Sequence, residues 1–451
     1  MKNKVIILGG GISGLSIRYF LSQYQPHLDI TLLEKDNHLG GLIQSNNRQN
    51  FFFESGARTF KASKSHALLR LIQELGMEKE LLVSRKEASG RYLWKDEKLQ
   101  PLPKHPLALF SSPLVRPLIP SLLKEWKQKS FVGDESIHSF VSRRLGAKAA
   151  KTLFDPMTLG IYAGDIEKLS VKSCFPALKK LEEEHGSITK GMLKKKKKSL
   201  LYPEGVSSSS LFTLKAGVGS LIEKLAEKGE GEIVFNALAT NVHFKETQVE
   251  VEAGGKTFTA DHLFCALSAK GAEGLTKSWD ANVATFFQNL EHVSLSVIHL
   301  GFNQKLLKQE GFGYLIPSIE REEILGVVFD SSAFPDQNMA KLETRLTVMM
   351  GGAFHPEHHL KDKDKRLKEA LKGIQTHLGI IEKPAYTHVV DYPNGIPQFT
   401  VGHQERKEAF QKIARQKYPH VTFLGNYLDG VAVSDCVANA KELALLDKLD
   451  V

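Results

Sequence analysis

The sequence contains few cysteines, and their scarcity excludes several classes of protein. Its three cysteines, Cys174, Cys265 and Cys436, lie far apart in a chain of 451 residues. No pair has the spacing of a metal site, and three scattered thiols do not make a disulfide framework. We therefore expect a protein of a reducing compartment in which all three cysteines are buried as small apolar residues.

Long apolar runs are also absent. No uninterrupted apolar stretch approaches the ~18–20 residues of a transmembrane helix. The N-terminal "MKNK" leads directly into the apolar run "VIILGG", without room for a signal or transit peptide. These absences predict a cytoplasmic protein.

Acidic residues are outnumbered by basic ones, 51 against 60, which gives a formal net charge of +9. This balance favours an anionic partner such as an acidic substrate, a phospholipid surface or nucleic acid. No stripe of interleaved aromatic and basic residues supports nucleic acid, so we expect none to bind.

The residues that are present describe a soluble α/β protein of about two or three domains. Residues 4–35 give the pattern strand, glycine loop, helix, strand, and the strands are continuous apolar runs typical of a buried parallel sheet. Residues 232–267 alternate apolar and polar side chains, which predicts an antiparallel meander with a hairpin at Gly254 and Gly255.

The N-terminal glycine loop has the spacing of a dinucleotide-binding fingerprint. It consists of Gly9, Gly10, Gly11, Ile12, Ser13 and Gly14. The first glycine permits the tight turn, Gly11 lets the backbone approach a pyrophosphate, and Gly14 lets helix and strand pack closely. The helix N-terminus supplies unpaired N–H groups to that phosphate. Glu34 follows 20 positions after Gly14 (34 − 14 = 20), where it can accept hydrogen bonds from an adenosine ribose.

A stretch in the middle of the chain has a different composition. Residues 101–120 hold six of the 17 prolines, which excludes a central strand or a long helix there. Five lysines follow at 194–198. A lysine run is typical of a solvated face, and contact with an anionic membrane surface is the alternative.

Several motifs resemble one family of flavoenzymes. The pair Gly40-Gly41, shortly after Glu34, is similar to FAD-containing oxidases of the amine oxidase superfamily. Further motifs resemble the protoporphyrinogen oxidase family in the same order along the chain, namely "FFFESGARTFKAS" (51–63), "DPMTLGIYAGDIEKLSVKSCFPAL" (155–178), "GFGYLIPS" (311–318), "GIPQFTVGH" (395–403) and "YLDGVAVSDCVANA" (427–440). The resemblance covers nearly the whole chain, and its last motif is the most specific.

The resemblance implies a three-part architecture. A discontinuous Rossmann-like FAD-binding domain would collect residues 1–84, 206–269 and 396–451. A helical membrane-associating domain would span residues 85–205, and a substrate domain built on an antiparallel sheet would span residues 270–395.

The resemblance also implies the reaction, a six-electron oxidation of protoporphyrinogen by FAD in haem biosynthesis. The electron acceptor would be oxygen or a respiratory quinone. Peripheral contact with the inner face of the cell membrane and a homodimer are both compatible with it.

The cofactor residues implied by the resemblance extend beyond the glycine loop and Glu34. They are Lys35, Gly41, Leu42, Gly56, Ala57, Arg58, Thr59, Val242, Asn426, Val431, Ala432 and Val433. Relatives often carry proline in place of Ala57, and this departure concerns only the rigidity of the local turn. The strand, turn and helix near residues 423–444 would close over the flavin end of the same site.

A porphyrinogen is a large apolar ring with acidic arms, so its site should be an apolar slot with cationic anchors. The residues that match such a slot are Arg91, Gly160, Ile161, Phe312, Leu315 and Met349. Arg91 would bind a propionate through two parallel N–H···O bonds. The alternatives are ordinary core packing for the apolar members and a solvated surface position for Arg91.

Other functions remain open at this point. A coproporphyrinogen oxidase would need more cationic anchors, and an amine oxidase or carotenoid desaturase would share the fold. A binding protein similar to Rab GDP-dissociation inhibitors would carry no catalytic flavin. No general base is evident, because a lone histidine in an apolar setting, such as His299 or His403, is typical of a core residue.

Overall fold

A five-stranded parallel sheet is assembled from three distant parts of the chain. The computed structural model describes residues 3–103, 112–194 and 201–446. The strands of this sheet, in spatial order, are β10 (Glu232–Val234), β2 (Asp29–Leu33), β1 (Lys4–Leu8), β14 (His262–Cys265) and β20 (Val421–Phe423). All neighbouring pairs in it are parallel.

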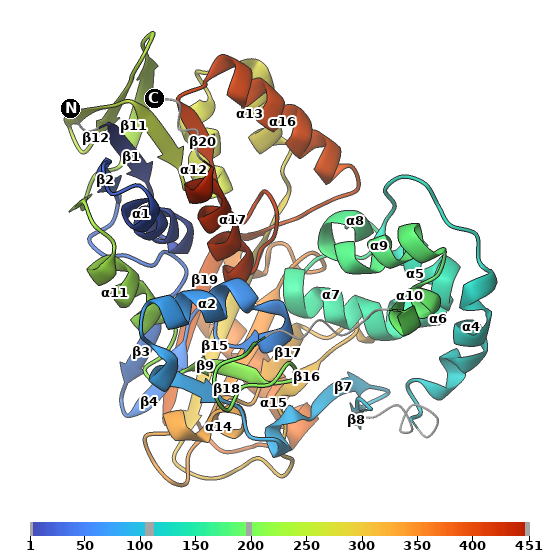
Figure 1. Ribbon diagram of the computed structural model, residues 1–451. Coiled ribbons are helices and arrows are strands. Elements are labelled where there is room, and N and C mark those ends of the chain that lie inside the picture. The colour runs from blue at the N-terminus through green and yellow to red at the C-terminus, as the bar shows by residue number, and fades with distance from the viewer. Residues whose placement is uncertain (1–2, 104–111, 195–200, 447–451) are drawn as a thin grey trace.

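The two faces of this sheet are buried beneath different elements (Figure 1). In β1 the side chains alternate, so Val5 and Ile7 join one apolar cluster while Ile6 and Leu8 join another. The first cluster is covered by α1 (Ile12–Tyr24), α2 (His66–Glu74), α11 (Gly219–Lys228) and α17 (Val433–Leu445). The second is covered by α12 (Ala269–Thr276), α13 (Ala281–Gln288), α16 (His403–Lys417) and a meander of β11 (Ala239–Phe244), β12 (Val249–Ala253) and β13 (Lys256–Ala260).

The structure confirms three predictions. The chain is a mixed α/β protein. The meander turns at Gly254 and Gly255, which both have positive φ angles. All three cysteines are buried and free.

A seven-stranded sheet forms the second large layer. Its strands, in spatial order, are β19 (Tyr386–Pro397), β15 (His292–Phe302), β18 (Thr344–Gly351), β17 (Ile324–Val328), β16 (Gly313–Leu315), β7 (Arg91–Lys95) and β8 (Lys98–Pro101). Pairing is antiparallel except between β16 and β7. α15 (Lys363–Leu378) packs against one face through Ala370 and Ile374. A short helix, α14 (Asp330–Ala333), follows β17.

The segment 91–101 differs from the predicted domain limits. It lies within the range predicted for the helical part, yet it forms β7 and β8 of the seven-stranded sheet. The cause is pairing with β16, a strand more than two hundred residues later in the chain. The other domain limits stay predictions.

Two small sheets connect the layers. A hairpin of β3 (Ser45–Arg48) and β4 (Phe51–Glu54) packs Phe51 and Phe53 beside Tyr386. The other small sheet consists of β5 (Phe60–Lys61), β9 (Leu211–Leu214) and β6 (Leu81–Val83).

The remaining helices gather at one side of the molecule (Figure 1). They are α4 (Ile119–Lys124), α5 (Ile137–Leu145), α6 (Ala147–Ala149), α7 (Asp155–Tyr162), α8 (Val171–Cys174), α9 (Pro176–His185) and α10 (Ile188–Lys194). We call them the helical block. Most of the predicted lysine run and residues 104–111 of the proline-rich stretch lie outside the described residues. Within the described residues, no helix combines the length and the apolar character needed to cross a membrane.

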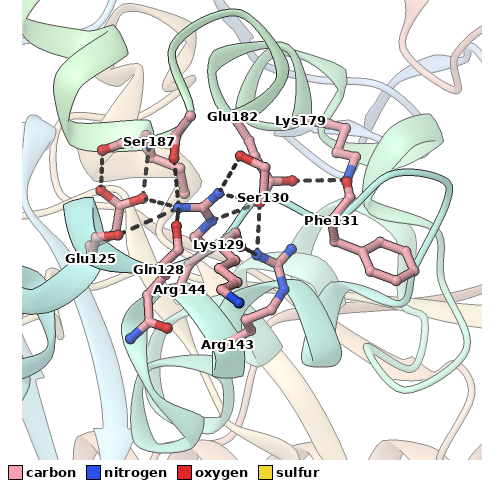
Figure 2. Close-up of polar contacts among 12 residues, drawn as sticks. Glu125, Gln128, Lys129, Ser130, Phe131, Arg143, Arg144, Lys179, Glu182 and Ser187 are labelled. Atoms are coloured by element: carbon pink, nitrogen blue, oxygen red, sulfur yellow. Dashed lines mark hydrogen bonds and ion pairs between the residues drawn. The ribbon is translucent and has the colours of Figure 1, made fainter.

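A buried ion network fixes the helical block (Figure 2). The Arg144 guanidinium is fully buried and donates to Glu182 at 2.7 Å and to Glu125 at 3.2 Å. Burial alone would raise the pKa of Glu182, but hydrogen bonds from Arg143, Lys179 and Arg144 outweigh it and hold that pKa at about 2. Each buried charge therefore has a partner of opposite charge. The ion pairs link α5 to α9 and to the segment after α4.

Candidate active site

The glycine loop joins β1 to α1 at the carboxyl edge of the parallel sheet. The Gly9 N–H donates to the Leu33 carbonyl at 2.8 Å, which ties the loop to β2. A Cβ on Gly14 would lie 1.9 Å from the Gly9 carbonyl oxygen, so only glycine allows this approach. A Cβ on Gly11 would meet no described heavy atom within 4 Å, which leaves open space above the loop. Ile12 and Ser13 begin α1, whose first N–H groups have no intrahelical partner.

Glu34 lies directly after β2 and holds the loop. Its Oε2 accepts from the Gly10 N–H at 2.6 Å, and its Oε1 accepts from the Asp36 N–H at 2.9 Å. A carboxylate has about four lone-pair positions, so Glu34 retains capacity for a further donor. Lys35 is exposed and pairs with Asp36 at 2.7 Å.

The second glycine pair packs against the first loop. The Gly40 N–H donates to the Gly10 carbonyl at 2.9 Å, and Gly40 and Gly41 both have positive φ angles. Leu42, which follows, is 49% exposed beside the open space. A Cβ on Gly56 would lie 1.9 Å from the Leu42 carbonyl oxygen. The motif that continues with Ala57 and Thr59 is thereby brought next to the glycine loops.

The C-terminal turn reaches the same edge of the sheet. β20 runs parallel to β14, so the turn that follows it emerges beside the turn that follows β1. Asn426 is half-buried in this turn, Ala432 caps α17 and Val433 begins it, with Val431 just before. Two helix N-termini therefore lie at one sheet edge, an arrangement that favours a bound anion.

Val242 occupies a different environment from the other predicted cofactor residues. Its side chain is buried in the apolar cluster beneath the meander, with Val249 and Val251. Its contact with a cofactor stays a prediction.

A buried group of charges lies between β4 and the seven-stranded sheet. The Arg58 Nη1 atom is 3.5 Å from Asp330 Oδ1, and it has no hydrogen-bond partner among the described residues. Thr347 donates to Asp330 at 2.7 Å. Burial raises the pKa of Glu54 to about 7. The hydrogen bond that its carboxylate accepts from the Val218 N–H at 2.7 Å lowers this pKa, but by less than burial raises it. Among the described residues the Arg58 Nη1 donor thus has an ion-pair partner but no hydrogen bond, so it can donate to a further acceptor.

Predicted substrate residues converge near one edge of the seven-stranded sheet. β16 pairs with β7 so that Gly313 opposes Arg91, and the guanidinium carbon of Arg91 lies 5.7 Å from the centre of the Phe312 ring. α7 contacts β16, and a Cβ on Gly160 would lie 2.9 Å from Leu315 Cδ1. The glycine therefore lets the helix approach the strand closely.

Met349 lies on β18, two strands further into the sheet than β16. It pairs with Gly326 on β17 and packs with an apolar cluster that includes Leu159 of α7. Ile161 is 40% exposed and is not part of that cluster. The structure thus brings Met349 to the same helix and strands as the rest of the predicted set, with Ile161 at the solvent side.

Arg91 is partly covered by protein atoms and partly open to solvent. It is exposed to solvent, yet the protein atoms around it bury enough of the guanidinium to lower its pKa. Burial, and after it the charges of Arg91 and Lys64, lowers the pKa of Lys61. Arg91 and Lys64 therefore both lie within electrostatic reach of Lys61.

Three members of this region had no role predicted from the sequence. Glu54 and Lys61 lie within the motif at 51–63, and Asp330 lies within "GVVFDSSAFP" (326–335), but the resemblance assigned none of them a function. The four-residue spacing between Glu54 and Arg58 is the one signal that could have indicated a charge group there.

Comparisons with known proteins agree with this geometry. Residues 12–444 match the family model for flavin containing amine oxidoreductase. The chain is 32% identical to protoporphyrinogen oxidase of Bos taurus, and the match covers 98% of each chain. It is 27% identical to coproporphyrinogen III oxidase of Staphylococcus aureus, again over 98% of each chain.

The fold is shared with a solved structure. A crystal structure of a protein from Exiguobacterium sp. 255-15, assigned to the protoporphyrinogen oxidases, superposes with a TM-score of 0.86 at 22% identity and covers 98% of each chain. The family model and the bovine relative show that the chain belongs to the flavin-containing amine oxidoreductase family, and within it to the protoporphyrinogen oxidase family.

Proposed function

We propose that this protein oxidises protoporphyrinogen IX to protoporphyrin IX with FAD, and that oxygen accepts the electrons. The observation that carries the proposal is the group formed by Arg91, Phe312, Leu315 and Gly160. It combines one cation with apolar surface beside a glycine, and so suits a flat apolar ring with acidic arms. The bovine and staphylococcal relatives support the same substrate class.

The residues at the parallel sheet suit an FAD molecule. The open space above Gly11 would admit a pyrophosphate, and Glu34 has lone pairs left for a ribose. Arg58, whose buried Nη1 makes no hydrogen bond within the described part of the chain, would donate to the flavin end. Asn426 and the N-terminus of α17 would lie on its other side. When bound, FAD accepts electrons from the substrate in pairs.

The protein side chains would bind and orient the porphyrinogen. The Arg91 guanidinium would donate to a propionate, and its contact with Phe312 would hold it in place. Leu315 and Met349 would flank the apolar ring. We name no general base, because no histidine of the described residues lies within this group.

A second substrate is favoured by one further observation. Coproporphyrinogen III carries four propionates, and Lys61 supplies another cation whose pKa responds to Arg91. The two substrates are distinguished by mixing the purified protein with each porphyrinogen and following porphyrin fluorescence. A higher kcat/KM with coproporphyrinogen III would replace the first proposal with the second, and no enzyme-dependent fluorescence with either would refute both.

The electron acceptor is tested in the same assay. We expect porphyrin to form in air without additives and to stop under anaerobic conditions. Anaerobic turnover that requires an added quinone would instead assign the electrons to a respiratory quinone.

We further propose that the helical block contacts an anionic membrane surface. The exposed apolar side chains of its helices and of the segments between them include Leu123, Trp126, Val132, Met192 and Leu193. The ammonium groups of Lys127 and Lys190 each lie 5.5 Å from the centre of the Trp126 ring, so basic and apolar groups occur together.

Co-sedimentation with vesicles that contain phosphatidylglycerol tests the membrane proposal. Trp126→Ser should reduce the bound fraction, whereas Leu342→Ser, at a 60% exposed position outside the helical block, should not. Equal binding by both variants, or none by the unchanged protein, would contradict the proposal.

A further inference from the structure

Two side chains on one face of α16 bind the C-terminal turn. This turn spans residues 425–432, between β20 and α17. His403 Nε2 lies 3.1 Å from the Leu428 carbonyl oxygen, and Lys407 pairs with Asp429. His403 and Lys407 are four residues apart, so they share one side of the helix. Two consecutive residues of the turn are therefore fixed by a single helix face.

The hydrogen bond decides which nitrogen of His403 carries the proton. A carbonyl oxygen only accepts, so Nε2 must be the donor. The ring is 1% exposed, and burial lowers its pKa to about 4, so it is neutral at pH 7. Its Nδ1 is buried and has no hydrogen-bond partner among the described residues. His403 is therefore a fixed donor, and its ring stacks on Phe399 with centroids 4.2 Å apart.

The start of α16 is tied to the helical block. The Gly402 N–H donates to Asp134 Oδ2 at 2.9 Å, and the Ser170 hydroxyl donates to Asp134 Oδ1 at 2.8 Å. The Ser170 N–H donates to the Phe399 carbonyl at 2.8 Å. His403 is thus fixed on one side by the helical block, and it holds the turn on the other.

We propose that His403 is a positioning residue, whose Nε2–H holds the Leu428 carbonyl and thereby sets the place of the 425–432 turn against the flavin. The inference rests on the proposed function, which puts the flavin beside this turn. Without the donor, a carbonyl that is now hydrogen-bonded loses its partner, and the turn would shift to find another. A displacement of about 1 Å is enough to slow an enzymatic reaction strongly.

Three substitutions in the full-length flavoprotein separate the donor from the ring. His403→Gln places an amide N–H within reach of the carbonyl, His403→Asn is one methylene shorter, and His403→Phe keeps the stacked ring without a donor. We expect His403→Gln to keep kcat within about twofold of the unchanged protein. The other two should lower kcat about tenfold with KM unchanged, the effect of one lost hydrogen bond, and should shift the visible absorption spectrum of the flavin.

His262→Phe is the matched control. His262 is also buried, burial lowers its pKa to about 4, and its Nε2 lies 2.9 Å from Thr422 Oγ1. It begins β14, at the opposite end of that strand from the turn. His262→Phe should therefore lower stability while leaving the flavin spectrum and kcat unchanged.

Equal kcat values and spectra for the Gln, Asn and Phe variants would overturn the proposal, as would an equal spectral shift in His262→Phe. If His403→Phe does not fold, the comparison of Gln with Asn decides alone. The flavin spectra are measured without substrate. They therefore test His403 even if the unchanged protein oxidises neither porphyrinogen, a result that would refute the proposed function separately.

Discussion

Replacing Arg91 by alanine removes a cation that lies against Phe312, one of the proposed ring-binding residues. The guanidinium carbon lies 5.7 Å from the Phe312 ring centre on a strand of the seven-stranded sheet. Neither the glycine loops nor Arg58 contacts this position in the hydrogen-bond network, so FAD should remain bound. We expect the loss to concern the substrate alone.

The magnitude follows from the bond that is lost. A hydrogen bond to a charged group contributes about 1.5–3 kcal/mol. Since each 1.4 kcal/mol is about a factor of ten, KM should rise about 10- to 100-fold. A contact made equally in the ground state and the transition state changes KM and leaves kcat nearly constant. Arg91→Lys keeps the charge without the paired donors, so its KM should lie between those of the unchanged protein and of Arg91→Ala.

Porphyrin fluorescence at increasing porphyrinogen concentration measures both constants. Arg85→Ala is the control, because Arg85 is largely exposed and forms only a 3.8 Å pair with Asp336. An unchanged KM in Arg91→Ala would remove Arg91 from the substrate site. A loss of flavin absorbance in the same variant would show that the residue supports the cofactor instead.

Further predictions concern the loop, the ion network and pH. Gly14→Ala should lower the melting temperature of the FAD-free protein, because its Cβ would lie 1.9 Å from the Gly9 carbonyl oxygen; Gly11→Ala should leave that temperature unchanged and weaken FAD binding in a flavin titration. Arg144→Met should reduce the free energy of unfolding in urea by about 3–5 kcal/mol, because it removes a buried cation that pairs with both Glu125 and Glu182; an unchanged unfolding midpoint would contradict this. Burial lowers the folded-state pKa of His262 to about 4, below its unfolded value of 6.5. The unfolded state therefore binds more protons between these values, so stability should fall as pH drops from 6.5 to 4, and His262→Asn should reduce that slope in melting curves.

The glycine loops were predictable because their signals are local. The spacing from Gly9 to Gly14 depends only on a strand, a turn and a helix that are adjacent in the chain. Steric contact explains why glycine is needed at Gly14 and Gly56, since a Cβ at either position would overlap a carbonyl oxygen. The hairpin at Gly254 was predictable for the same reason.

Contacts between distant segments could not be predicted from composition or spacing. The segment of β7 was predicted to belong to the helical domain, because no local pattern near Arg91 indicates that this strand pairs with β16. The pair of Arg58 with Asp330 and the ion network around Arg144 likewise join groups from separate elements. Sequence periodicity shows which side of an element is apolar, but it does not show which polar side chains meet across two elements.

His403 illustrates the same limit at a single residue. Its apolar surroundings predicted a core histidine, and the ring is indeed buried on Phe399. Its hydrogen bond to Leu428 joins two motifs that are separate in the chain, so neither motif alone could predict it.

The central claim is that a porphyrinogen gives its electrons directly to the flavin of this protein. Rapid mixing of the FAD-loaded protein with protoporphyrinogen IX or coproporphyrinogen III, without oxygen, measures that step. We predict that the visible absorbance of the flavin bleaches with at least one of the two, more slowly in Arg91→Ala at low substrate concentration. Because one flavin takes up only two of the six electrons, porphyrin fluorescence should appear only after air is admitted. A flavin that stays oxidised with both porphyrinogens would contradict the account.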